Sequence, residues 1–235
     1  MFAGHIGAAL VIARVETRLN LGIFIFAALL LDVLLWIFVL AGWETVTIRP
    51  DFGVTHQPAF VFPYSHGLLA SVAWAMLAGA TVLVARPGRD IKTLRAAVLV
   101  GAAVFSHWLL DALVHVPELP LVGIDSAKVG LGLWQDMPVA LAVEALIVVA
   151  GLGIFIPGAR LSRNGKLWLT TLSLVLLAFT VAGLTIAPAP PSATAMAASS
   201  LVTILVVGVV ACWIGAAVEK TQPHAYAPQR KNSRV

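Results

Sequence analysis

Three ionisable side chains recur at every fourth position in the stretch 105–121, which reads FSHWLLDALVHVPELPL. They are His107, Asp111 and His115, and on an α-helix this spacing places them on one face. The first part of the stretch is apolar enough to lie in a bilayer, where ionisable groups are costly and usually functional. A histidine and an aspartate one helical turn apart can both reach one metal ion. The stretch therefore predicts one wall of a metal site.

The composition indicates what kind of protein must hold these side chains. Of the 235 residues, 60% are hydrophobic and 11% are charged, whereas a soluble domain has about 25% charged residues. The net charge of +4 comes from short basic clusters between apolar runs, as in membrane topology signals, and does not indicate nucleic-acid binding. The lone Cys212 excludes an internal disulfide. The first residues lack the basic segment of a signal peptide, so we expect them to be retained.

The apolar runs predict an all-α fold, a polytopic transmembrane helix bundle with six strong spans and an N-terminal membrane-inserted helix. The six spans are expected at 20–43, 66–85, 96–114, 137–156, 167–187 and 194–218. The N-terminal helix is either a seventh span or a helix that dips into the membrane from the cytoplasm. We expect one transmembrane domain over 1–218, with the polar site within 1–145, and a basic, disordered tail over 219–235.

The basic residues predict the orientation of the bundle. If six spans alternate, all basic clusters fall on one side, which the positive-inside rule assigns to the cytoplasm together with the C-terminus. These clusters are Arg14 with Arg18, the segment 86–95, the segment 160–166 and the tail. The loops 44–65, 117–136 and 188–193 then face outward.

Counting residues from the cytoplasmic side brings the intramembrane ionisable groups to similar depths. His5, Asp32, His107 and Glu144 all come at roughly 18–21 Å, taking 1.5 Å per residue. Asp111 and His66 come one to two turns higher. All of them fall in the outer half, where an outward-facing pocket would admit water and a polar headgroup.

This convergence predicts a bound divalent metal ion, because buried carboxylates are then paired with a cation. The expected ligands are His5, Asp32, His66, His107 and Asp111, and Glu144 or Asp32 is expected to act as general base. Imidazole with carboxylate suits zinc, manganese or iron, with zinc preferred.

Each of these residues also has a plainer interpretation. Asp32 alone fits an interhelical hydrogen bond, Glu144 a structural partner, and His66 the cap of a helix. His115 and His56 are interpreted as interfacial or loop histidines outside the ligand set.

The same residues lie in a pattern that resembles a known family. The pattern is an early Gly-His (His5), an aspartate after a Leu-rich run (LLLDVLLW, Asp32), a YSHGLL element (His66) and SHWLLD (His107 and Asp111). It resembles the predicted membrane-bound metal-dependent hydrolases of bacterial inner membranes over roughly the first 145 residues. The resemblance implies a metal site, a hydrolytic reaction and an inner-membrane location. This chain lacks one carboxylate and one histidine of the fuller pattern, which argues against a two-metal site.

Three functions therefore remain open from the sequence. The first is a metal-dependent hydrolase acting on a membrane lipid or another amphiphile. The second is a non-enzymatic accessory subunit with protein partners in a larger membrane complex. The third is a haem- or pigment-binding subunit that uses His66, His107 or His115 as an axial ligand. A transporter is disfavoured because inverted repeats are not evident.

Overall fold

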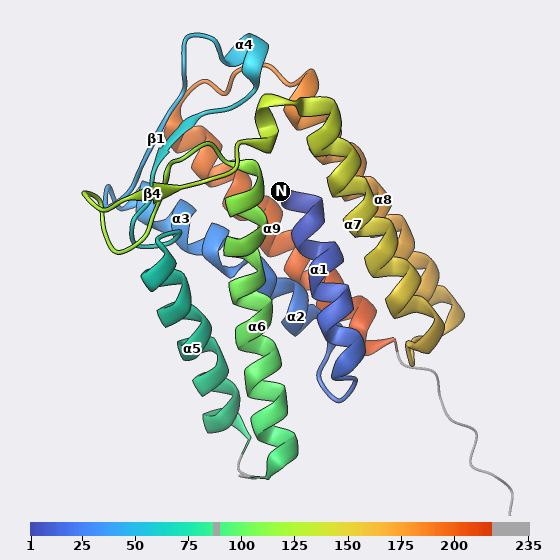
Figure 1. The fold of residues 1–235 in the computed structure, drawn as a ribbon. Coiled ribbons are helices and arrows are strands. Elements are labelled where there is room, and N and C mark those ends of the chain that lie inside the picture. The colour runs from blue at the N-terminus through green and yellow to red at the C-terminus, as the bar shows by residue number, and fades with distance from the viewer. Residues whose placement is uncertain (87–89, 218–235) are drawn as a thin grey trace, which may run out of the picture.

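The computed structural model describes residues 1–86 and 90–217 and confirms the all-α helical bundle (Figure 1). Within these residues, five helices are long and apolar enough to cross a bilayer. They are α5 (Leu68–Ala85), α6 (Ile91–Val114), α7 (Met137–Phe155), α8 (Arg163–Thr185) and α9 (Ala193–Ala216). Large apolar side chains cover their outer faces, and Met76, Val84 and Val209 are each at least 70% exposed. Such surfaces fit contact with lipid chains. The predicted tail at 219–235 lies outside the described residues.

The stretch 20–43, predicted as one span, consists of two helices. These are α2 (Leu21–Ala28) and α3 (Leu30–Leu40), whose axes differ in direction by 49° at Leu29. If the bent pair counts as one span, the described part of the chain has up to six. Neither proline nor glycine lies at the bend, although these residues are common causes of kinks.

The N-terminal helix α1 (Phe2–Val15) has 14 residues and begins inside the bundle, where the preceding residue Met1 is buried (Figure 1). It packs closely on α7, since a Cβ atom added to Gly151 would lie 2.4 Å from the carbonyl oxygen of Gly7. At its other end, Arg95 of α6 donates to the carbonyl of Val15 over 2.7 Å. Helix α1 therefore extends from one end of the bundle into its interior and does not cross it.

The basic clusters of the described residues gather at that same end. Arg18 donates to the carbonyl of Lys92 over 2.9 Å. The backbone nitrogen of Ser162, the N-cap residue of α8, donates to the carbonyl of Ala217 after the end of α9 over 2.9 Å. Only the first part of the segment predicted as a loop at 86–95 precedes α6, because α6 begins at Ile91 and is capped by Asp90.

Short elements cover the opposite end of the bundle (Figure 1). Strand β1 (Thr45–Thr47) pairs antiparallel with β2 (Ala59–Val61), and β3 (Leu119–Pro120) pairs with β4 (Lys128–Val129). The helix α4 (Phe52–Thr55) lies between β1 and β2 in sequence, and the 3₁₀ turn η1 (Leu133–Gln135) precedes α7. A second 3₁₀ turn, η2 (Ile156–Gly158), follows α7 at the end that carries the basic clusters. The loops predicted at 44–65 and 117–136 thus form a structured cap.

Candidate metal centre

Helix α6 supplies His107 and Asp111, whose side chains lie one turn apart and are both buried. The Nε2 atom of His107 lies 3.1 Å from Oδ2 of Asp111. The i, i+4 spacing predicted this pair. What the spacing alone does not fix is the direction of the imidazole ring, which depends on the neighbouring bent pair.

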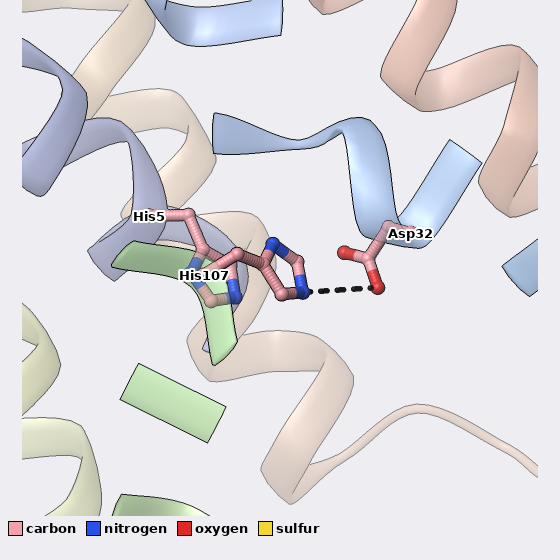
Figure 2. A group of neighbouring side chains, drawn as sticks. All are labelled: His5, Asp32 and His107. Carbon is pink, nitrogen blue, oxygen red and sulfur yellow. Dashed lines mark ion pairs between the residues drawn. The ribbon is translucent and has the colours of Figure 1, made fainter. Parts of the chain in front are cut away.

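The bend between α2 and α3 orients both His107 and Asp32. It leaves the carbonyl of Ala28, the last residue of α2, free to accept a hydrogen bond from Nδ1 of His107 over 2.7 Å. Because α3 begins directly after the bend, Asp32 lies in the first turn of α3. The Oδ1 atom of Asp32 then lies 3.6 Å from Nε2 of His107 (Figure 2). A straight helix would pair the Ala28 carbonyl with its own backbone.

His66 reaches the site from the cap, immediately before α5. The turn that carries it is tight, because a Cβ atom on Gly67 would lie 2.5 Å from the carbonyl oxygen of Pro63. The Nδ1 atom of His66 lies 2.8 Å from Oγ of Ser65, and Ser65 donates to Oε2 of Glu44 over 2.7 Å. This leaves Nε2 of His66 directed at the other site residues.

Glu44 anchors this network although it lies 21 residues away in sequence. Its Oε1 atom accepts hydrogen bonds from the backbone nitrogens of Tyr64 and Ser65, over 2.7 and 2.8 Å. Burial raises the pKa of Glu44 above its ordinary value, and the donors around the carboxylate oppose that rise. A carboxylate that orients a histidine through a hydroxyl is a common support of a metal ligand.

Four atoms from these elements lie close together. They are Nε2 of His66, Nε2 of His107, Oδ1 of Asp32 and Oδ2 of Asp111, and five of their six separations lie between 3.1 and 3.6 Å. A tetrahedron whose corners are about 2.0–2.1 Å from its centre, as for zinc with nitrogen and oxygen ligands, has edges of about 3.3 Å. These five separations are therefore close to the edge lengths of a zinc site, and we refer to the four atoms as the cage.

The hydrogen bonds also place a hydrogen on Nδ1 of each of the two imidazoles. A carbonyl only accepts, so Nδ1 of His107 carries a hydrogen, and Nδ1 of His66 donates to the Ser65 hydroxyl that is already donating to Glu44. In the neutral rings Nε2 is then unprotonated. With both rings neutral, all four converging atoms are acceptors, which repel one another unless a cation lies between them. The donor set therefore fits a divalent metal.

His5 lies beside this cage on α1. Its ring stacks on that of His107, with centroids 3.7 Å apart and planes within 8° (Figure 2). Its Nε2 atom lies 3.2 Å from Oδ1 of Asp111, the carboxylate oxygen that faces away from the cage. His5 also forms a possible ligand trio with Asp32 and His107, beside the trio of His66, His107 and Asp111. Both trios share His107, which has one free ring nitrogen, so the geometry fits one ion.

The remaining candidates lie outside the cage. Glu144 is buried in α7, and its Oε1 atom accepts from the backbone nitrogen of Gly4 over 3.1 Å. It thereby supports the start of α1. His56 bonds to the carbonyl of Ala187 over 3.0 Å. His115 pairs with Glu118 over 2.6 Å, and its Nε2 atom lies 3.9 Å from Oδ2 of Asp111. His115 is nearer the site than its interpretation as an interfacial residue implied.

A cavity of about 480 Å³ opens onto the cage, a size within the usual range of about 300–1,000 Å³ for small-ligand sites. His5, Asp32, His66, Asp111 and His115 form its polar side. The side chain of Asp32 is 21% exposed, more than the other cage residues. Apolar and aromatic side chains form most of the remaining wall, among them Trp36, Phe52, Phe60, Phe62, Trp134 and Phe179.

Two parts of the site were missed in the sequence. Glu44 and Ser65 were assigned to a polar loop, and the only available signal was an acidic residue directly after a span and a serine directly before His66. Helices α8 and α9 carry no motif, yet Thr180, Gly183, Ser199 and Thr203 line the cavity. Their serine and threonine residues gave no distinguishing signal, because such hydroxyls commonly bond to their own helix, as these do.

Comparison of the chain with known protein families, curated proteins and solved structures gave no match.

Proposed function

We propose that the chain is a metal-dependent hydrolase of the bacterial inner membrane that acts on a lipid-like substrate, with the C-terminus in the cytoplasm. The observation that carries the proposal is the cage of four acceptor atoms from His66, His107, Asp32 and Asp111. The motifs around these residues also resemble those of the predicted membrane-bound metal-dependent hydrolases. The long apolar helices supply the membrane setting.

The cage residues have distinct parts in this proposal. A divalent ion, with zinc preferred, supplies Lewis acidity and an activated water when it is bound at such a site. His66 and His107 are held with Nε2 inward by Ser65 and by the Ala28 carbonyl. Asp32 is the cage carboxylate most open to the cavity, so its second oxygen is suited to accept a proton from an attacking water. Glu144 is less suited to this role, because its bonded carboxylate supports α1.

Haem ligation receives less support than a single ion. The Nε2 atoms of His66 and His107 face each other over 3.1 Å, which leaves no room for a porphyrin between them. The carboxylates of Asp32 and Asp111 approach the same point. Carboxylate with imidazole is a donor set for zinc, manganese or iron ions.

Metal analysis of the purified protein tests the proposal. We expect about one divalent ion per chain and hydrolysis of ester or phosphodiester probes that is lost with a chelator and restored by zinc. His107→Ala should abolish both, whereas His56→Ala, which removes a cap histidine that bonds to Ala187, should keep the metal. A metal-free wild-type protein, or full metal content in His107→Ala, would overturn the proposal.

A further inference from the structure

The charge balance of the cavity bears on which substrates it accepts. Among the described residues, no lysine or arginine side chain lines the cavity. Three carboxylates, those of Asp32, Asp111 and Glu144, face one divalent ion and the N-terminal ammonium of Met1, which lines the cavity 3.4 Å from Oδ1 of Asp111, so the loaded site is close to neutral. Sites that bind phosphate esters usually add arginine, lysine or further metal ions to balance the substrate's charge. The cavity offers none of these side chains.

The cavity walls favour a hydrocarbon chain beside the reacting group. Phe52, Phe60 and Trp134 come from the cap, and Phe179 and Ile204 come from α8 and α9. The hydroxyl of Thr203 donates to the carbonyl of Ser199 on its own helix, over 2.8 Å. Thr180 likewise donates to Leu176 over 2.9 Å. Because these hydroxyl hydrogens are already bonded within the helices, the two threonines offer no hydrogen-bond donor to a ligand.

We infer that the substrate is an uncharged acyl ester or amide whose hydrocarbon chain occupies this cavity and whose carbonyl lies at the cage. This inference rests on the proposed function and names the substrate class of the same site. Hydrolysis adds the oxygen of water to the carbonyl carbon and breaks its bond to the leaving oxygen or nitrogen. One proton of the water passes, by way of Asp32, to the leaving atom, and the other departs from the carboxylic acid product.

Gly183 of α8 provides a variant that changes the cavity without touching the cage. It lines the cavity, and a Cβ atom added there would meet no atom within 4 Å. Gly183→Leu should therefore fill part of the space meant for the chain. Gly153 of α7 is a matched control, since a Cβ atom there also meets no atom within 4 Å and it is not a cavity residue.

The activity test uses nitrophenyl acyl esters from acetate to hexanoate, with nitrophenyl phosphate and bis-nitrophenyl phosphate as charged probes. For the zinc-loaded protein we expect kcat/KM to rise by up to about fourfold for each added methylene, from about 0.8 kcal/mol of transfer free energy per group. The phosphate probes should be inert. Gly183→Leu should flatten the dependence on chain length, and Gly153→Leu should keep it.

A binding test measures the same preference, for acyl over phosphate groups and for longer chains, without hydrolysis. Alkyl hydroxamic acids and alkyl phosphates of equal chain length are compared by the shift that they cause in the thermal unfolding midpoint of the zinc-loaded protein. We expect stabilisation by the hydroxamates alone, growing with chain length and reduced in Gly183→Leu.

The outcomes separate this inference from the function on which it rests. Hydrolysis of the phosphate probes with inert acyl esters would overturn the acyl class and leave a metal-dependent hydrolase standing. A protein that holds stoichiometric zinc, yet neither hydrolyses any probe nor binds the hydroxamates, would overturn both.

Discussion

Replacing Ser65 by alanine should weaken metal binding although Ser65 contributes no atom to the cage. The Ser65 hydroxyl accepts from Nδ1 of His66 over 2.8 Å and donates to Glu44 over 2.7 Å. Without it, the His66 ring loses the bond that keeps Nε2 inward, and a buried ring nitrogen is left without its partner. Loss of such a support typically lowers metal affinity about 10- to 100-fold, which corresponds to about 1.4–2.8 kcal/mol.

The assay is competition for zinc between the detergent-solubilised protein and a chromophoric chelator, which reports the dissociation constant. Ser173→Ala is the matched control, because Ser173 is also a buried serine but bonds to the carbonyl of Leu169 on its own helix. Its zinc affinity should equal that of the wild type. If Ser65→Ala binds zinc as tightly as Ser173→Ala does, the orientation of His66 does not depend on this network and the reasoning is refuted.

Three other substitutions test the packing of α1 and the role of Glu144. Gly151→Ala should destabilise the protein by about 1–3 kcal/mol in thermal or denaturant unfolding, because a new Cβ atom would meet Gly7 at 2.4 Å. Gly153→Ala on the same helix faces open space and should be neutral or stabilising by up to about 1 kcal/mol; equal stabilities would contradict this contact. Glu144→Gln should retain about one metal ion per chain by elemental analysis, since its carboxylate bonds to Gly4, whereas a metal-free variant would make Glu144 a ligand.

Much of the candidate site followed from spacing and depth. The i, i+4 pair of His107 and Asp111 follows from helix geometry alone. Counting residues from the basic ends placed His5, Asp32 and His107 at a common depth, and the structure brings them within contact of one another. Depth is predictable for a transmembrane helix because its length is set by the bilayer and its rise per residue is constant.

The details that orient the ligands could not be predicted in this way. The bend at Leu29 lies in an uninterrupted apolar run, and it is accompanied by a tertiary hydrogen bond from His107 to Ala28 rather than by a local breaker. Glu44 approaches Ser65 only because the cap folds back over the bundle. Such contacts join residues far apart in sequence, and hydrophobic periodicity carries no information about them.

The apolar wall of the cavity could not be predicted from the sequence, for a different reason. Residues of α8 and α9 that face the cavity have the same composition as residues that face lipid, since both surroundings are apolar. His115 was placed outside the site because it follows the end of α6. The cap instead holds it beside the cavity through Glu118.

X-ray absorption at the zinc edge of the purified, zinc-loaded protein tests the central claim most directly. The cage of His66, His107, Asp32 and Asp111 predicts four nitrogen and oxygen ligands from the protein at about 2.0–2.1 Å and one oxygen from the activated water, with the multiple scattering typical of two imidazoles. His66→Ala should remove half of the imidazole signal. A shell of six oxygens without imidazole, or a sulfur ligand from Cys212, would contradict the account.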